Sequence, residues 1–160
     1  MPSFSIAKDD PLISTNFFLE ITGNVISNLT SVDGLSVEIE KADINQRTTK
    51  GTFIQHVTMS KPKWTGELTV KRLAPLTSTA DPLWKWFNTI RTKGMAASSR
   101  TKQRKSGSIV IYDASMAEKS RWNFTEAWPS KIAVDSVDVT KNEPIMESIT
   151  FQYETLFRVK

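Results

Sequence analysis

The stretch of residues 120–132 constrains the fold of this chain more than any other, because aromatic and polar side chains alternate along it. Trp122, Phe124 and Trp128 share one parity, whereas Arg121 and Asn123 take the other. A period of two is typical of a β-strand that lays one face on a core and leaves the other wet. We therefore expect this strand to lie across the core.

Two residues interrupt that pattern. Glu126 falls on the aromatic parity, which indicates either a β-bulge or a carboxylate held by a buried partner. Pro129 has no amide hydrogen, so the paired part of the strand should end near Trp128 or lie on a sheet edge. Because aromatic side chains bury large areas, we expect others to converge on this strand. The expected core aromatics are Trp64, Trp84, Phe87, Trp122, Phe124 and Trp128.

Further alternating stretches predict that most of the chain is strand. Asp81 and Pro82 supply an N-cap and a first-turn proline for the one expected helix, at about residues 82–93, and Gly94 supplies its end. We expect seven to nine strands and a mainly β fold, an antiparallel β-sandwich or split barrel with this one helix on its flank. The expected strands cover residues 16–22, 25–29, 35–40, 64–72, 108–112 and 145–154, besides the aromatic segment.

The expected helix carries an apolar stripe formed by Leu83, Trp84, Phe87 and Ile90. Trp86 falls outside this stripe. An exposed tryptophan is uncommon in a monomer, so Trp86 is either a surface aromatic or an anchor for another subunit.

Two segments lack any regular pattern. Residues 1–15 look like an N-terminal arm that a partner would order. Residues 41–55 are rich in polar side chains, and an extended loop of that length inside a compact domain is usually functional or mobile. The whole chain, residues 1–160, has the length of a single domain.

The charge of this chain is unevenly distributed. There are 21 basic and 17 acidic residues, a formal net charge of +4. The stretch between Asp81 and Asp113 holds no acid, and such a block either attracts a polyanion or an acidic neighbouring subunit or is only a solvated loop. Its basic residues are Lys85, Arg91, Lys93, Arg100, Lys102, Arg104 and Lys105.

The inventory of reactive side chains argues against catalysis. The chain has no cysteine and one histidine, His56, and a lone histidine is more often structural than catalytic. It contains no glycine-rich phosphate loop, metal-ligand spacing or nucleophile motif. We expect no enzyme activity, no cofactor and no metal.

The chain has no apolar segment typical of a signal peptide or membrane span, so we expect synthesis in the cytoplasm and no membrane anchor.

Binding to nucleic acid is the main alternative from a different functional class. The basic cluster at residues 99–105 could neutralise phosphates, and a β-barrel module could bind through residues 91–105. A single-strand binder needs aromatic side chains for stacking, however, and residues 94–110 contain none.

Seven short motifs follow one another along nearly the whole chain, and their order is more specific than any one of them. This ordered set resembles the tail tube proteins of contractile phage tails and of extracellular contractile injection systems, a group related to the type VI secretion tube protein. The motifs are Asn16-Phe-Phe-Leu-Glu-Ile, Ser31-Val-Asp-Gly-Leu35 entering Glu38-Ile-Glu40, Gly66-Glu-Leu-Thr-Val-Lys-Arg72, Asp81-Pro-Leu-Trp-Lys-Trp86, Gly107-Ser-Ile-Val-Ile-Tyr-Asp113, Arg121-Trp-Asn-Phe-Thr-Glu-Ala-Trp-Pro129 and Glu147-Ser-Ile-Thr-Phe-Gln-Tyr-Glu154.

The resemblance implies a structural role in an assembled phage tail or injection particle. Six subunits would join their sheets into one β-barrel ring, and rings would stack into a rigid hollow tube inside a contractile sheath. The partners it implies are other copies of the chain, the sheath protein, baseplate or tube-initiator and spike proteins, and DNA or effector protein as cargo in the lumen. A tube-initiator at the baseplate is the alternative within the same family.

The resemblance also implies roles for particular residues. Residues 41–55, together with the N-terminal arm, would contact the adjacent ring, and the residues expected there are Lys41, Asp43, Asn45, Arg47, Lys50 and Phe53. Tube proteins of this family in phages tend to have lumens that do not attract DNA, so the basic segment either departs from the family or lies elsewhere. We hypothesise that it faces the sheath or a neighbouring subunit, and the residues expected there are Trp86, Arg100, Lys102, Arg104 and Lys105.

Overall fold

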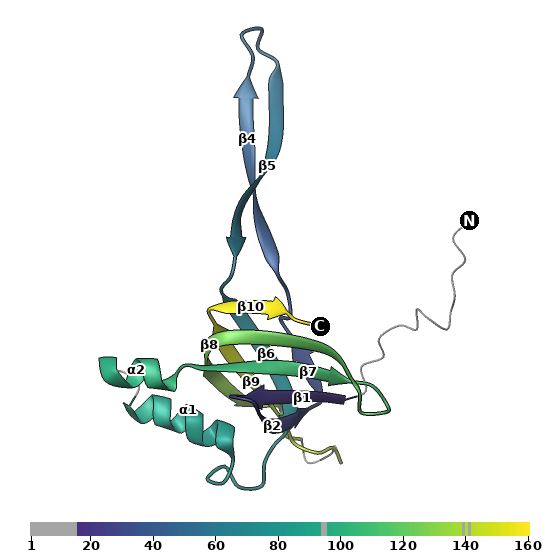
Figure 1. The fold of residues 1–160 in the computed structure, drawn as a ribbon, viewed down its shortest axis with the longest axis vertical. Helices are drawn as coiled ribbons and strands as arrows, with labels where there is room; N and C mark the ends of the chain where they lie inside the picture. Colours follow the sequence, from purple (N-terminus) through teal and green to yellow (C-terminus); the bar gives the residue numbers. More distant parts are fainter. Residues whose placement is uncertain (1–15, 94–95, 139, 141) are drawn as a thin grey trace, which may run out of the picture.

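An eight-stranded antiparallel sheet forms the body of the molecule (Figure 1). The computed structural model describes residues 16–93, 96–138, 140 and 142–160, so the expected arm at residues 1–15 lies outside the described residues. The expectation of a mainly β, antiparallel fold is confirmed. The strands of this sheet are β1 (Asn16–Ile21), β2 (Asn24–Leu29), β3 (Ser31–Asp33), β6 (Gly66–Leu73), β7 (Lys105–Tyr112), β8 (Glu118–Val134), β9 (Met146–Tyr153) and β10 (Thr155–Arg158).

The strand order explains how the sheet surrounds a core. It runs β2-β1-β7-β8-β9-β6-β3, with β10 beside β8. The two ends of this path, β2 and β3, are separated in the chain only by Thr30, whose N–H donates to Lys71 O in β6 at 2.8 Å. The sheet therefore curls back toward its own start as a split barrel.

Strand β8 links the two halves of the sheet because it changes partner along its 17 residues. Its first part pairs with β7 and β10, and from Trp128 onward it pairs with β9. Glu126 has a φ of 51°, and the β7 register shifts opposite it, so this residue marks a bulge. Its side chain is 47% exposed, which rules out the alternative of a buried carboxylate. Pro129 does not end the pairing, which continues to Val134 after a register shift.

The core fills the interior of the curled sheet. Phe124 and Phe151 are fully buried and stack with ring centroids 6.2 Å apart. Trp122 and Trp128 are partly buried against this cluster. The other buried members are Leu19, Ile21, Leu29, Leu68, Val70, Leu83, Trp86, Ile109, Ala127, Ile149, Tyr153 and Leu156.

Gly107 in β7 has no room for a side chain. A Cβ at this position would lie 2.5 Å from the Phe124 ring and 2.6 Å from the backbone oxygen of Glu20. We predict that Gly107→Ala lowers the free energy of unfolding by about 1–3 kcal/mol, the usual cost of overpacking a core. Urea unfolding followed by tryptophan fluorescence measures this, with Gly23→Ala as a contrast in which strain at φ 81° acts without a clash. Equal stability of Gly107→Ala and the parent protein would contradict the packing argument.

The expected core aromatics are corrected in part. Trp64, at 56% exposure, is a surface residue at the point where the chain enters β6. Trp84 and Phe87 are half-buried and lie outside the core cluster, contacting each other edge to face with centroids 6.2 Å apart.

Two helices lie on the flank of the sheet (Figure 1). Helix α1 (Pro82–Lys93) has the expected bounds, but its buried face is different. Leu83 and Trp86 are buried and Ile90 packs on the core, so Trp86, only 4% exposed, is not a surface anchor. Helix α2 (Ala97–Gln103) was not expected, and it occupies the segment predicted as a basic loop. No helix of the described residues is long and apolar enough to cross a membrane.

A long hairpin projects from the body (Figure 1). Its strands, β4 (Glu38–Arg47) and β5 (Phe53–Lys63), pair only with each other. The expectation of an irregular loop at residues 41–55 is therefore wrong, since only residues 48–52 connect the two strands. The strand expected at residues 35–40 is also corrected, because residues 34–37 are not in a strand and β4 begins at Glu38.

Candidate functional site

The hairpin presents two distinct faces. Residues directly opposite one another on paired strands lie on the same face, and β4 pairs Lys41 with Met59 and Asp43 with Val57. Asn45 is paired with Gln55 and Arg47 with Phe53 in the same way. We call this set the odd-numbered face. The even-numbered face holds Ala42, Ile44 and Gln46 opposite Thr58, His56 and Ile54.

The odd-numbered face gathers five of the six residues expected to contact an adjacent ring, and the sixth, Lys50, lies in the turn at the tip. Its β4 row is polar and charged, with an ion pair between Lys41 and Asp43 at 3.5 Å. Its β5 row is largely apolar, and Phe53, Val57 and Met59 are 59%, 63% and 81% exposed.

Such a hairpin lacks the packing that normally supports a strand pair. A two-stranded hairpin is at best marginally stable in water without a third strand or a covering element. All of β5 except Ser60 and all of β4 except Ala42 is exposed. Apolar side chains are exposed on both faces of the hairpin, and such exposure is typical of a surface that a partner covers.

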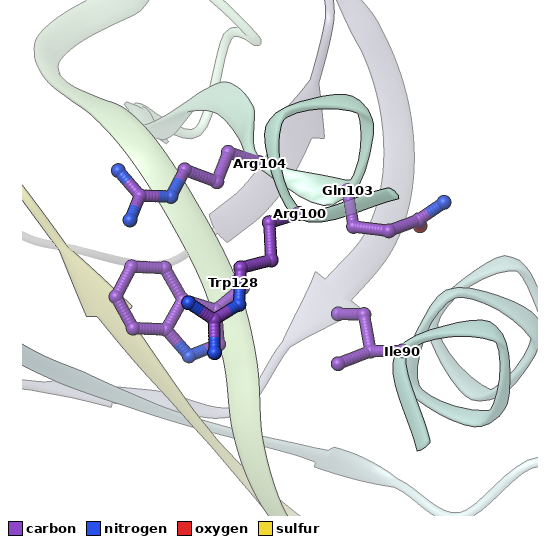
Figure 2. Close-up of a pocket in the computed structure, with 5 residues that line it drawn as sticks. All are labelled: Ile90, Arg100, Gln103, Arg104 and Trp128. Carbon is purple, nitrogen blue, oxygen red and sulfur yellow. The ribbon is translucent and has the colours of Figure 1, made fainter. Parts of the chain in front are cut away.

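A cavity of about 270 Å³ lies between α1, α2 and β8 (Figure 2). It is lined by Ile90, Arg100, Gln103, Arg104 and Trp128. The Arg104 guanidinium carbon lies 5.2 Å from the centroid of the Trp128 ring, within cation–π range. Two guanidinium groups and an indole therefore meet in one concave site.

The basic residues expected to contact the sheath or a neighbour are not equivalent. Arg104 pairs with Glu126 at 4.0 Å and Glu154 at 3.7 Å. Lys105 lies over the Trp86 ring at 4.8 Å. Within the part of the chain that the structure describes, Arg100 and Lys102 form no ion pair. Arg100 lines the cavity and Lys102 does not.

Trp86 has a different role from the one expected. Its indole Nε1–H donates to Gln103 O at 2.8 Å, and its ring packs 5.9 Å from that of Phe151. Trp86 therefore joins α2 to the core and helps to fix one wall of the cavity.

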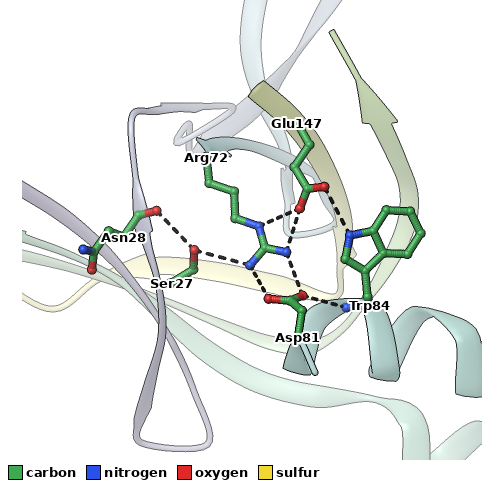
Figure 3. A network of polar contacts seen from close by, with 6 residues as sticks. All are labelled: Ser27, Asn28, Arg72, Asp81, Trp84 and Glu147. Carbon is green, nitrogen blue, oxygen red and sulfur yellow. Dashed lines mark hydrogen bonds and ion pairs between the residues drawn. The ribbon is translucent and has the colours of Figure 1, made fainter. Parts of the chain in front are cut away.

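A buried polar network anchors the start of α1 (Figure 3). Arg72 Nε donates to Glu147 at 2.7 Å, and its Nη1 and Nη2 donate to Asp81 at 2.8 and 2.7 Å. Trp84 Nε1–H donates to the other Glu147 oxygen at 3.1 Å. Arg72 is 4% exposed and Glu147 1%, so this cluster holds its charges away from water.

The network also sets the ionisation of its members. Burial alone would raise the pKa of Asp81, but hydrogen bonds from Arg72 and from the Trp84 N–H outweigh it and lower this pKa. Burial alone would lower the pKa of Arg72, but hydrogen bonds to Asp81 and Glu147 raise it. The sequence itself indicates that Arg72 and Glu147 are buried. Arg72 falls on the same parity as the buried residues of β6, and Glu147 on that of the buried residues of β9.

The lowered pKa of Asp81 predicts an acid-dependent loss of stability. A carboxyl group whose folded pKa lies below its unfolded value, 3.8, stabilises the fold above that pH, and this contribution disappears as pH falls through the folded pKa. Asp81→Asn, which keeps a good N-cap, should therefore cost about 1.5–3 kcal/mol at pH 7. The difference from the parent protein should shrink below about pH 4. Urea unfolding at pH 7, 5 and 3 measures it, and a constant difference would refute the assignment.

A second ion cluster ties β1 to β8. Arg121 Nη1 donates to Glu20 at 2.6 Å, and its Nε and Nη2 donate to Glu118 at 3.1 and 2.8 Å. Hydrogen bonds to Glu118 and Glu20 raise the pKa of Arg121, and the Arg121 hydrogen bond lowers the pKa of Glu118. This cluster joins β1 and β8 across β7 and stabilises the sheet.

The described residues contain no group of three or more His, Asp or Glu side chains placed to hold a metal ion. His56 stands on the even-numbered face of the hairpin opposite Ile44. The hairpin and the basic cavity are candidate surfaces for binding a partner.

Comparison with known proteins gives the family. The family model for the T4-like virus tail tube protein gp19 matches residues 13–156. No curated relative matches the sequence. Among solved structures, the chain is 20% identical to a protein in the extended PVC sheath–tube complex of an extracellular contractile injection system, with a TM-score of 0.70 over 99% of this chain and 98% of that chain.

Two further structures share the fold. A protein in the PVC sheath/tube terminator is 18% identical with a TM-score of 0.71, over 95% of this chain and 99% of that chain. A protein in the anti-feeding prophage (AFP) baseplate is 15% identical with a TM-score of 0.73, over 94% of this chain and 97% of that chain. Because the family model spans nearly the whole chain, the chain belongs to the T4-like virus tail tube protein family and is a structural tube protein.

Proposed function

We propose that this chain is the main inner-tube subunit of a contractile injection particle. Six copies form a ring, the rings stack into a rigid hollow tube, and a contractile sheath drives that tube through a target envelope. The main support for this proposal is the match of the family model to residues 13–156. The likeness in fold to a protein of a sheath–tube complex supports it and favours a headless injection system over a phage tail.

The hairpin is the proposed contact between rings. Its odd-numbered face offers Lys41, Asp43, Asn45, Arg47 and Phe53 to the adjacent ring, and Lys50 contacts it from the tip. The exposed apolar row on β5 supports this role, since burying it would supply the packing that the hairpin lacks in a single subunit.

Contacts within a ring are proposed at the sheet edges. β2 pairs only with β1, and β10 only with β8, among the described strands. An unpaired strand edge is a template for pairing with another chain. Neighbouring subunits would cover these edges and continue one sheet around the ring, with polar strand faces toward the lumen and its cargo of effector protein or DNA.

The basic segment is proposed to face the sheath or a neighbouring subunit through Arg100, Lys102, Arg104 and Lys105. The cavity beside Arg100 and Arg104 supports a contact with an acidic partner. Trp86 is excluded from this contact because it is buried. Spike and baseplate proteins would meet the tube at its end.

Electron microscopy of the purified protein tests the proposal. At increasing concentration the protein should form six-membered rings and then hollow tubes, and native mass spectrometry should detect the hexamer. Rings that never extend would identify a tube-initiator or terminator, the alternative that the likeness to baseplate and terminator proteins supports. A monomer at all concentrations would reject a tube role.

One observation favours nucleic-acid binding as a second candidate. Trp128 supplies, from β8, the aromatic side chain that the basic segment lacks in its own sequence. A gel-shift assay with single-stranded DNA at moderate salt tests this, and the candidate predicts that Trp128→Leu weakens binding. The absence of any shift for the parent protein would reject it.

A further inference from the structure

The basic cavity lies at the hairpin end of the body. Trp128 in β8 pairs with Gln152 in β9, next to Tyr153. A second cavity, of about 340 Å³, shares Arg104 and Trp128 with the first and extends to Gly66 and Tyr153. Tyr153 and Gly66 also line a third cavity with Glu38 and Lys63, the residues at the base of the hairpin. A partner that engages the hairpin base is therefore close to the basic cavity as well.

The connection at the opposite end of β9 exposes carboxylate and apolar side chains. β8 ends at Val134 and β9 begins at Met146. Between them, Val137 and Ile145 are 71% and 50% exposed, and Asp138 and Glu143 are exposed too. Neither carboxylate forms an ion pair within the described residues.

Asp138 has a defined orientation. One of its oxygens accepts hydrogen bonds from the Thr140 N–H at 2.9 Å and the Thr140 hydroxyl at 2.7 Å, and these lower the pKa of Asp138. The side chain therefore stays ionised at neutral pH. The second oxygen accepts no hydrogen bond within the described residues.

These two surfaces are complementary but do not meet within one subunit. Both combine charge with apolar area. At the cavity, Arg100, which forms no ion pair among the described residues, stands beside Trp128 and Ile90, whereas Arg104 already pairs with Glu126 and Glu154. At the connection, Asp138 and Glu143 stand beside Val137 and Ile145. Six residue steps separate Trp128 from Val134 along β8, about 20 Å at the rise of a strand. A contact between them therefore has to form between two copies, head to tail.

We propose that the cavity lined by Arg100, Arg104 and Trp128 receives Asp138 and Glu143 of a second copy of this chain in the next ring. The contact is heterologous, so it propagates along a stack and does not close on a pair of subunits. It rests on the proposed stacking of rings, and it assigns the basic segment to a neighbouring subunit in preference to the sheath.

Charge reversal tests the contact, with the concentration needed for tube assembly as the readout. Arg100→Glu should raise that concentration about tenfold or more, because it places an acid opposite an acid. Lys85→Glu is the matched control, since it changes the net charge equally at an exposed position of the neighbouring helix α1 but does not line the cavity. It should change assembly by less than about threefold. Glu143→Lys should act like Arg100→Glu, and the double variant should recover assembly.

Disulfide capture gives an independent readout, because the chain has no cysteine of its own. Gln103→Cys places a thiol in the cavity and spares the Trp86 hydrogen bond, which uses the Gln103 backbone oxygen. Mixing this variant with Glu143→Cys under mild oxidation should give a cross-linked heterodimer. Lys85→Cys, outside the cavity, mixed with Glu143→Cys should give several-fold less.

The outcomes separate this contact from the tube role itself. If Arg100→Glu forms tubes normally and the mixture of Gln103→Cys and Glu143→Cys yields no cross-link, the contact is overturned and the proposed function still stands. Loss of sheath attachment or of DNA binding with unchanged assembly also overturns it, in favour of those partners. A parent protein that forms no rings or tubes rejects the proposed function and this contact together.

Discussion

Arg72→Met is expected to lower the free energy of unfolding by about 3–5 kcal/mol, because it leaves buried carboxylates without their cation. Glu147 is 1% exposed and accepts from Arg72 at 2.7 Å. Asp81 loses two hydrogen bonds at once, at 2.8 and 2.7 Å. The network ties β6, β9 and the start of α1 together, so the loss should be felt by the whole body.

Urea unfolding at pH 7 measures this effect, and the neighbouring residue supplies the control. Lys71 pairs with Asp135 at 3.3 Å, but both side chains are close to half exposed. Lys71→Met should therefore cost only about 0–1 kcal/mol. Similar losses for the two variants would contradict the view that burial decides the effect.

A double substitution separates the charge from the packing. Arg72→Met combined with Glu147→Gln removes the more deeply buried of the two unpaired carboxylates, leaves Asp81 charged, and keeps an acceptor for Trp84 Nε1–H. The double variant should be more stable than Arg72→Met alone, because the penalty belongs mainly to the unpaired carboxylate. Equal stability of the two would assign the loss to packing.

The elements that pack on the core were the ones that the sequence predicted well. The bounds of α1 follow from Asp81 and Pro82, and the bulge at Glu126 follows from a carboxylate on the apolar parity. The first signal is local, because an N-cap side chain accepts from the free N–H groups of the first helical turn. The second arises because a buried face restricts which residues occupy it. The buried face of α1 was mistaken because the 3.6-residue period places Trp86 as well as Phe87 three or four residues from Leu83.

The hairpin was missed for the corresponding physical reason. Alternation is a signature of a strand with one face buried, and β4 and β5 bury neither face in the subunit. Residues 41–47 therefore showed no pattern, although they form a regular ladder with β5. A segment that packs on no other part of its own subunit carries little of the signal that marks a core strand.

The basic cavity required the three-dimensional structure. Helix α2 has no apolar stripe, and one link that joins it to the body is the hydrogen bond from Trp86 to Gln103 O. Trp128 comes from β8, and the bulge at Glu126 shifts the parity so that Ala127 and Pro129 are buried while Trp128 is only partly covered. Long-range juxtapositions of this kind leave no pattern along the sequence.

The hairpin should decide whether rings stack. We expect Phe53→Asp combined with Val57→Asp, on the odd-numbered face, to abolish tube formation and leave the subunit folded. Each apolar side chain that becomes fully buried contributes about 1.5–3 kcal/mol, and a carboxylate in its place has to be desolvated. The body should be unaffected, because both residues are 59–63% exposed in the single subunit. Sedimentation velocity and electron microscopy measure assembly, and thermal unfolding measures the fold.

The even-numbered face of the same hairpin provides the matched control. Ile44→Asp combined with Ile54→Asp adds the same charge to the same two strands, at residues 43% and 37% exposed. If the odd-numbered face contacts the next ring, this variant should still form tubes, with at most a modest rise in the required concentration. The reverse result would place the contact on the even-numbered face and withdraw Lys41, Asp43, Asn45, Arg47 and Phe53 as contact residues. Tubes from both variants would show that the stack holds together without the hairpin contact. The exposed faces of the hairpin would then have to be covered by a partner other than the adjacent ring.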